Sequence, residues 1–289
     1  MLNESLHKYF RSTYKSEINN TSPVSGGSIN NAAKVKLKNG EAYFVKWNKE
    51  SLVHMFETEA KGLELLKKAK TDLVFPKVED YNVIPEENIS FLVMEYLEPK
   101  TPVNSFYENF GKQLAQLHEN KSDTYGLDHD NFIGRLPQDN SPSVDWISFF
   151  IERRLRPQFE MAVDSAQLPA TLIQNFERLC ELLPDMLPDE KPSLLHGDLW
   201  GGNYLCVSDK QAALVDPAVY YGNREIELSF TQLFGGFDDS FYDAYNEAMP
   251  LQSNFNERVD IYNLYPLLVH VNMFGRAYAS QVQAIIQDY

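Results

Sequence analysis

The stretch SPVSGGSINNAAKVKLKNGEAYFVKWN, residues 22–48, indicates most directly how the chain begins to fold. Glycine and serine gather at 25–28, and Asn39-Gly40 separates the runs KVKL and EAYFVKW, which is typical of a hairpin. The stretch therefore predicts a strand, a glycine-containing turn, a second strand, a tight turn and a third strand.

The segments on either side complete a small lobe. Residues 3–16 place apolar side chains on one side of an amphipathic helix. Ser51 is a candidate cap for a second helix, whose apolar residues recur at helical spacing as far as Leu66. Two β-type runs follow, at 78–84 and 89–97. The order β-β-β-α-β-β predicts a five-stranded antiparallel sheet with an attached helix.

Beyond residue 100 the pattern becomes mainly helical. Prolines separate the helical segments, and only short strand-like pieces interrupt them. The expected helices span 104–119, 144–163 and 171–186, a loop spans 128–140, and strand-like pieces lie at 193–207 and 211–219. We therefore expect an α+β, bilobal fold. An N-terminal lobe would span 1–98 and a larger helical C-terminal lobe 99–289, with a cleft near the connector.

Composition excludes several classes of protein. The 289 residues include 26 Lys or Arg against 41 Asp or Glu, a net charge of −15, which argues against nucleic acids and anionic membranes as partners. The first residues have no apolar core typical of a secretory signal, and the apolar stretch 261–275 is too short to span a membrane. Cys180 and Cys206 are far apart, which argues against a disulfide framework. We expect a cytoplasmic protein.

The segment HGDLWGGN, residues 196–203, carries the clearest chemical signal. Asn203 follows Asp198 by five residues, and Asp216, in LVDPA, follows Asn203 by thirteen. These side chains could converge on one divalent ion and one hydroxyl group. Mg²⁺ takes oxygen ligands and keeps several waters, so Asn203 and Asp216 suffice when nucleotide phosphates supply further oxygens. Asp198 is then free to orient an acceptor hydroxyl and to take its proton.

Phosphoryl transfer also needs positive charge on the nucleotide side. Lys46, in the third predicted strand, could reach the α- and β-phosphates of ATP. Glu59, or less well Glu57, could hold this lysine from the next helix. The turn Ser25-Gly26-Gly27-Ser28 could direct backbone N–H groups onto the phosphates. The sequence thus predicts ATP and Mg²⁺ as cofactors.

Together, the strand lysine, the helix glutamate, HGDxxxxN and the later aspartate resemble the protein-kinase-like superfamily. The HGD form resembles its branch of aminoglycoside and choline phosphotransferases. The longer strings are similar to the fructosamine kinase (ketosamine-3-kinase) family over about residues 4–285; they include VSGGSINNA, FETEAKGLELL, LLHGDLWGGNYL and DPAVYYGNREIELSFTQLFGGF. The resemblance implies a protein-kinase-like bilobal fold. It also implies ATP-dependent phosphorylation of the 3-hydroxyl of ketosamines, either free sugar-amines or glycated protein lysines.

The resemblance also implies roles for single residues. Asp198 matches the family's proton acceptor, and Asn203 and Asp216 match its metal ligands. Lys46 and Glu59 match the phosphate-holding pair. The segment Met94-Glu95-Tyr96 matches the lobe connector, whose backbone would bind the adenine. Where relatives carry a cysteine in the glycine loop this chain has Ser28, so redox regulation through that loop is not expected. Glu227 stands where relatives often have Asp, and we expect it still to brace the catalytic loop.

Other residues are assigned to the acceptor side. Trp200 lies two residues after Asp198, and its flat indole suits stacking on a sugar or its amine substituent. Glu225, Asp238 or Asp239 could meet a substrate ammonium. Asn131, Gln138 and Asn140 could line the site. His196 is expected to brace the catalytic loop, and His54, His118 and His270 are interpreted as core or helix-surface residues.

Two alternatives remain open at this point. The acceptor could be an aminoglycoside, choline or homoserine, because the acidic composition suits any of these cations. The chain could also be a catalytically inactive nucleotide-binding module. The intact set of Lys46, Glu59, Asp198, Asn203 and Asp216 argues against inactivity.

Overall fold

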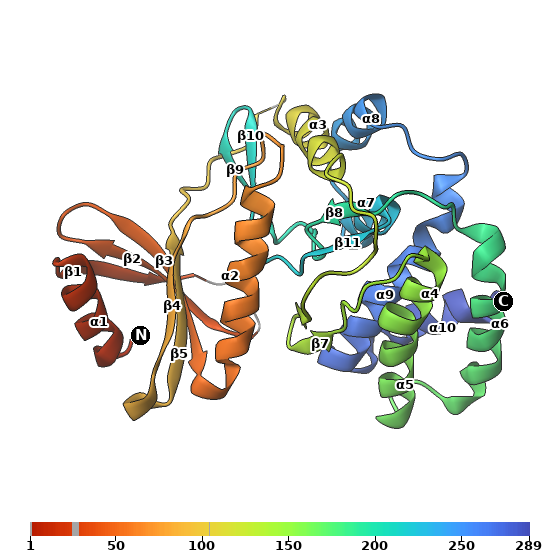
Figure 1. Cartoon of the computed structure of the whole chain (residues 1–289), viewed down its shortest axis with the longest axis horizontal. Helices are drawn as coiled ribbons and strands as arrows, with labels where there is room; N and C mark the ends of the chain where they lie inside the picture. Colours follow the sequence, from red (N-terminus) through yellow and green to blue (C-terminus); the bar gives the residue numbers. More distant parts are fainter. Residues whose placement is uncertain (1, 25–28, 104) are drawn as a thin grey trace.

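The computed structural model describes residues 2–24, 29–103 and 105–289, and it has two lobes (Figure 1). A twisted sheet forms the N-lobe, and helices form most of the C-lobe, as predicted. The predicted turn at Ser25–Ser28 lies outside the described residues.

The N-lobe sheet has five antiparallel strands in the order β1-β2-β3-β5-β4. The strands are β1 (Ile18–Pro23), β2 (Asn31–Leu37), β3 (Ala42–Lys49), β4 (Val78–Ile84) and β5 (Ile89–Glu95). The turn between β2 and β3 contains Gly40 at φ +97°, a conformation that favours glycine. The expected five-stranded sheet and its hairpin are therefore confirmed.

Two helices cover opposite faces of this sheet. On one face α1 (Glu4–Tyr14) buries Leu6 and Phe10 against strand residues such as Val45. On the other face α2 (Val53–Lys67) buries Phe56 and further apolar residues at helical spacing. Ser51 does not cap α2, contrary to the prediction, because it lies within a 3-10 helix, Glu50–Leu52, that precedes the helix proper.

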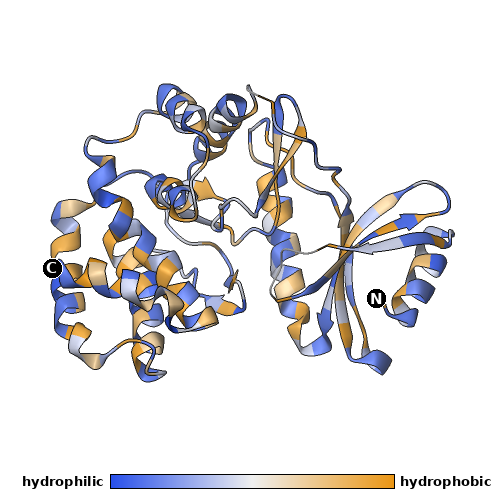
Figure 2. Ribbon diagram, turned by 180° about the vertical axis from the view of Figure 1, so that it is seen from behind, coloured by the Kyte–Doolittle hydropathy of each residue, from blue (hydrophilic) through white to orange (hydrophobic). Residues whose placement is uncertain are grey.

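The C-lobe helices are α3 (Phe106–His118), α4 (Trp146–Phe150), a π-helical turn (Ile151–Leu155), α5 (Arg156–Asp164), α6 (Ile173–Met186), α7 (Arg224–Leu233), α8 (Asp239–Ala248), α9 (Phe255–Phe274) and α10 (Ala279–Gln287). Most of them pack around a large apolar core, whereas α3 and α8 bury their apolar residues in the cluster that includes α2, and Figure 2 shows apolar and hydrophilic residues interspersed along the helices. Further 3-10 helices span Pro85–Glu87, Ala170–Leu172 and Arg276–Tyr278. No helix within the described residues is long and apolar enough to cross a membrane.

Three short antiparallel pairs supply the loops of the cleft. They are β6 (Asn131–Ile133) with β7 (Leu136–Gln138), β8 (Ser193–Leu195) with β11 (Tyr220–Gly222), and β9 (Tyr204–Ser208) with β10 (Gln211–Leu214). The β6–β7 hairpin replaces the loop expected at 128–140. Three-residue strands are too short to show an alternating pattern.

Candidate active site

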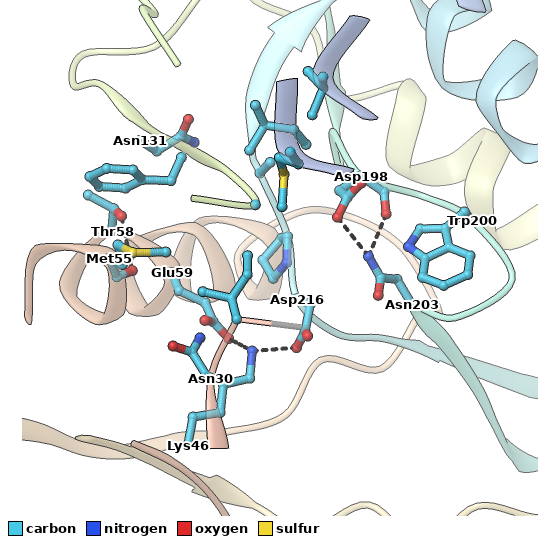
Figure 3. A pocket seen from close by; sticks show the side chains of 18 of the residues that line it. Asn30, Lys46, Met55, Thr58, Glu59, Asn131, Asp198, Trp200, Asn203 and Asp216 are labelled. Carbon is cyan, nitrogen blue, oxygen red and sulfur yellow. Dashed lines mark hydrogen bonds and ion pairs between the residues drawn. The ribbon is translucent and has the colours of Figure 1, made fainter. Parts of the chain in front are cut away.

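Lys46 on β3 is the charged centre of the cleft. Its Nζ donates to Glu59 Oε1 at 2.7 Å and to Asp216 Oδ1 at 2.6 Å, and the residue is only 5% exposed (Figure 3). The contact with Glu59 on α2 is the predicted one. Glu57 instead pairs with Lys61 on the helix surface. The contact with Asp216 joins residues 170 positions apart, so no local pattern could reveal it.

This arrangement sets the protonation of the lysine. Burial by itself would lower the pKa of Lys46, but the charges of Asp216 and Glu59 outweigh it and raise the pKa. Burial raises the pKa of Glu59, against the opposing effect of Lys46. Lys46 therefore stays protonated and carries a positive charge in the cleft.

Asp198 lies in the loop between β8 and β9 and faces the same cavity as Asp216. Asn203 Nδ2 donates to the backbone carbonyl of Asp198 at 2.8 Å and to its Oδ2 at 3.0 Å. The amide oxygen of Asn203 is thus the atom left for a cation. Burial, followed by the nearby charge of Asp216, raises the pKa of Asp198 well above its ordinary value.

Buried hydrogen bonds hold the catalytic loop from behind. Glu227 on α7 accepts from the N–H of Gly197 at 2.7 Å and from that of His196 at 3.2 Å. His196 Nε2 lies 2.9 Å from the carbonyl of Val215, next to Asp216. Glu227 and His196 thus make the expected braces. His118 on α3 adds a further contact to Glu227 at 2.9 Å that the sequence did not indicate.

Gly197 in the catalytic loop and Asp216 after β10 have left-handed backbone conformations. Gly197 has φ +83°, and a Cβ there would fall 2.0 Å from the carbonyl oxygen of Ala218, so only glycine fits. Asp216 has φ +58°, an uncommon value for a residue with a side chain. The N–H of Ala218 donates to the carbonyl of His196 at 2.9 Å, which ties the Asp216 segment to the catalytic loop.

Two cavities meet at this charged centre and share Lys46, Asn203 and Asp216. The first is lined by the predicted connector, Met94-Glu95-Tyr96. The N–H of Glu95 donates to Lys77 O at 2.8 Å and that of Tyr96 to Ala42 O at 3.4 Å, so these two donors are already engaged within the protein. We call the first the nucleotide cavity.

The second, or acceptor, cavity lies on the other side of the charged centre. Asp198, Trp200 and Asn131 line it, and Trp200 lies beside Asn203 and away from Lys46 in Figure 3. A Cβ at Gly202 would fall 2.4 Å from the Trp200 ring, so glycine makes room for the indole. Gln138 and Asn140 do not line either cavity; each donates to Asn131 Oδ1 instead.

Glu225 is not at the site, contrary to the prediction. Its side chain is 0% exposed, and its carboxylate accepts from Arg258 at 2.7 and 2.8 Å. The first eight residues of α7 are all buried, so the polar residues of this helix face the protein interior. Asp238 caps α8 by accepting from the N–H of Ser240 at 3.0 Å, and neither it nor Asp239 lines either cavity.

The acceptor cavity also contains residues that the sequence did not single out as site residues. Val269, His270, Met273 and Phe274 line it from the end of α9, and Gly134 lines it from the β6–β7 turn. For the four residues of α9 the only signal was an apolar helix pattern, which does not distinguish a cavity wall from a core.

The sequence matches the family model described as fructosamine kinase over residues 1–289. A probable ketoamine kinase of Vibrio parahaemolyticus is 39% identical over 268 residues, which cover 91% of this chain and 90% of that protein. The chloroplastic protein-ribulosamine 3-kinase of Arabidopsis thaliana is 37% identical over 281 residues, which cover 94% of this chain and 83% of that protein.

Comparison with solved structures supports the same family and shows the fold. A crystal structure of a putative fructosamine-3-kinase from Haemophilus somnus has a TM-score of 0.87 and 30% identity, covering 98% of this chain and 96% of that one. An amicoumacin kinase has a TM-score of 0.65 at 13% identity over 100% of this chain and 93% of that one, which shows the shared fold alone. The bilobal kinase-like fold and the resemblance are confirmed. The chain is a kinase that belongs to the fructosamine kinase family.

Proposed function

We propose that this chain transfers the γ-phosphoryl group of ATP to the 3-hydroxyl of ketosamines. The observation that carries the proposal is the meeting of Asp198, Asp216 and Lys46 where the nucleotide and acceptor cavities join. Phosphoryl transfer requires donor and acceptor in line across such a junction. The substrate class comes from the similar proteins, which are named for ketoamines and ribulosamines.

The residues on the nucleotide side would neutralise and hold the phosphates. Lys46 would turn its ammonium to the α- and β-phosphates while Glu59 keeps it in place. Met94, Glu95 and Tyr96 would contact the adenine from the connector. That Ser25, Gly26, Gly27 and Ser28 bind the phosphates stays a prediction, because these residues lie outside the described part of the chain.

The donor set at the junction fits Mg²⁺. Asn203 Oδ1 and the Asp216 carboxylate are both hard oxygen donors. Within the described residues no group of three His, Cys, Asp or Glu side chains could hold a metal alone, so nucleotide phosphates would complete the ligand set. When bound, Mg²⁺ would neutralise charge that develops on the phosphates.

On the acceptor side, Asp198 would orient the attacking hydroxyl and accept its proton as the new P–O bond forms. Asn203 fixes the orientation of this carboxylate through its two hydrogen bonds. Trp200 would stack on the sugar or its amine substituent. The substrate would be a free sugar-amine or a glycated protein. A reducing compartment such as the cytoplasm would suit Cys180 and Cys206, which are both buried and unpaired.

Assays with a panel of acceptors test this proposal. The purified protein is incubated with Mg·ATP and, separately, a fructosamine, a ribulosamine, choline and kanamycin, and the phosphorylated carbon is mapped by NMR. We expect phosphate on the 3-hydroxyl of the fructosamine or the ribulosamine. Turnover of choline or kanamycin alone would contradict the proposal.

The Asp198→Asn variant tests the assignment of the base. It keeps the shape and one oxygen of the side chain, so it should lower kcat by roughly 10²–10⁴-fold. Its melting temperature should still rise with Mg·ATP, because the nucleotide cavity is unchanged. Full activity in this variant would exclude Asp198 as the proton acceptor.

A further inference from the structure

Three aromatic side chains, Trp200, His270 and Phe274, line the end of the acceptor cavity, and a fourth, Phe234, packs against Trp200 and His270. We call them the aromatic wall. Their ring centroids lie 6.2 Å apart for Trp200 and Phe234, 4.8 Å for Phe234 and His270, and 5.5 Å for His270 and Phe274. Phe234 is 37% exposed and Phe274 is 48% exposed, so the wall is not simply part of the core.

The charged groups of the cavity lie elsewhere. Among the described residues that line it, the carboxylates are Glu59, Asp198 and Asp216, and these surround Lys46 and the catalytic loop. Glu225, the acid expected to meet a substrate ammonium, is buried against Arg258. A cation at the aromatic end must therefore be recognised without a carboxylate from these residues.

The backbone around the wall also favours a cation. Helix α7 ends at Leu233, just before Phe234, and α9 ends at Phe274. The C-terminal end of a helix carries partial negative charge on its last carbonyl groups. At the end of α9 the carbonyl of Met273 already accepts a hydrogen bond from the Arg135 guanidinium at 3.3 Å, so the favourable contribution of the backbone comes from the end of α7.

His270 adds a hydrogen-bond acceptor to the wall. Its Nδ1 lies 2.7 Å from the carbonyl of Pro266, which can only accept, so Nδ1 carries the proton. Nε2 of the neutral ring therefore carries a lone pair. A neutral imidazole does not repel an ammonium group, and its lone pair can accept one N–H.

We propose that the aromatic wall binds the ammonium group and first methylene groups of the amine substituent in the ketosamine. Ring faces attract alkylammonium ions through their quadrupole. In a ketosamine the amine is attached to C1, two carbons from C3, so a 3-hydroxyl held at Asp198 leaves the amine free to extend toward Trp200 and α9. This inference rests on the proposed function and adds to it the means by which the amine is recognised.

Two matched compounds test the proposal. One is 1-butylamino-1-deoxyfructose, which is cationic, and the other is 1-butanamido-1-deoxyfructose, a neutral amide of similar length. The ratio of kcat/KM for the cation to that for the amide is measured with Mg·ATP. Calorimetric binding of both compounds to the protein without nucleotide gives the same ratio in Kd, without turnover.

The variants Phe234→Leu and Phe274→Leu keep an apolar side chain but remove the ring. Each should lower the preference for the cation by about two- to thirtyfold, the range of a cation–π contact. Tyr81 is an exposed aromatic residue on β4 in the N-lobe. The variant Tyr81→Leu is therefore the control and should leave the preference for the cation unchanged.

The outcomes separate the two proposals. An unchanged preference in both Phe variants, or equal losses for the cation and the amide, would overturn the aromatic wall as an ammonium site. If the wild-type protein phosphorylates neither compound, the proposed function fails. In that case calorimetry still tests whether the aromatic wall binds the ammonium group. A wild-type preference for the cation that is lost in the Phe variants supports the wall as an ammonium site, and the absence of any preference in the wild type refutes it.

Discussion

At the scale of single residues, Lys46 joins the two halves of the site. One ammonium group contacts a carboxylate from α2 and a carboxylate from the segment after β10. A buried charge of this kind is stable only when its partners are in place. The side chain that would bind the nucleotide phosphates therefore depends on residues far apart in the sequence.

Replacing one of these partners should affect nucleotide binding first. In Glu59→Gln the lysine keeps Asp216 but loses the anion that orients it, so we expect the KM for ATP to rise by about tenfold or more. The matched control is Glu57→Gln, since Glu57 pairs with Lys61 and does not line either cavity. Steady-state kinetics with varied ATP measure the effect, and equal KM values in the two variants would contradict the role of Glu59.

At the scale of elements, α3 and the catalytic loop each contain a fully buried histidine. Burial lowers the pKa of His118 and of His196. In the unfolded chain both titrate near pH 6.5, so below that pH the unfolded state takes up protons that the folded state does not. The contribution of these two histidines to stability should therefore fall as the pH falls, whereas the raised pKa of Asp198 acts in the opposite direction.

The expected loss is about 1.4 kcal/mol per pH unit for each histidine, from pH 6.5 down to its folded-state pKa. Urea unfolding at pH 7.5 and pH 5.5 measures it. His118→Gln should make the dependence weaker, and His54→Gln, at an exposed residue of α2, should leave it as it is. The same pH dependence in the wild type and in His118→Gln would show that His118 takes up its proton in the folded protein as well.

The π-helical turn before α5 fixes the hairpin that borders the acceptor cavity. Arg154 in this turn is 0% exposed and donates to Asp139 O at 2.6 Å and to Asn140 Oδ1 at 2.7 Å. Asn140 in turn donates to Asn131, which lines the cavity. The buried guanidinium thus supports the acceptor site from behind.

Arg154→Met should leave these oxygen atoms without their donor, and we expect a loss of about 2–4 kcal/mol in unfolding free energy. Arg153→Met is the control. Arg153 makes an exposed ion pair with Asp139, which contributes about 1 kcal/mol or less. Urea titration compares the two variants, and equal stabilities would contradict a supporting role for Arg154.

At the scale of the whole molecule, one apolar cluster includes side chains of both lobes. Phe56 and Leu63 of α2 belong to the same cluster as Phe110 and Leu114 of α3. Gly62 lies against Val219, where an added Cβ would be 3.1 Å from Cγ2. Because side chains of both lobes form this core, unfolding of either lobe would expose apolar surface of the other.

We therefore expect the protein to unfold in a single transition. Differential scanning calorimetry should give a calorimetric enthalpy about equal to the van't Hoff enthalpy. Two resolved peaks would mean that the lobes unfold separately in spite of the shared core.

The sequence predicted most reliably what depends on short spacing. The patterns at 22–48, 78–84 and 89–97 predicted the strands of the sheet, although β1 begins earlier, at Ile18, and HGDLWGGN predicted the loop in which Asp198 and Asn203 are hydrogen-bonded. Long-range contacts such as Lys46 with Asp216 could not be read from any local pattern. Glu225 was misplaced for a physical reason: on a helix buried on all sides, polar residues that pair internally look like a solvated face.

The contact between Lys46 and Asp216 has a practical consequence for handling the protein. This ion pair joins two side chains of the chain itself, Lys46 Nζ and Asp216 Oδ1, at 2.6 Å and holds the aspartate in the cleft. Purification in buffers with a chelator should therefore leave the cleft correctly assembled, and activity should return as soon as magnesium is added back.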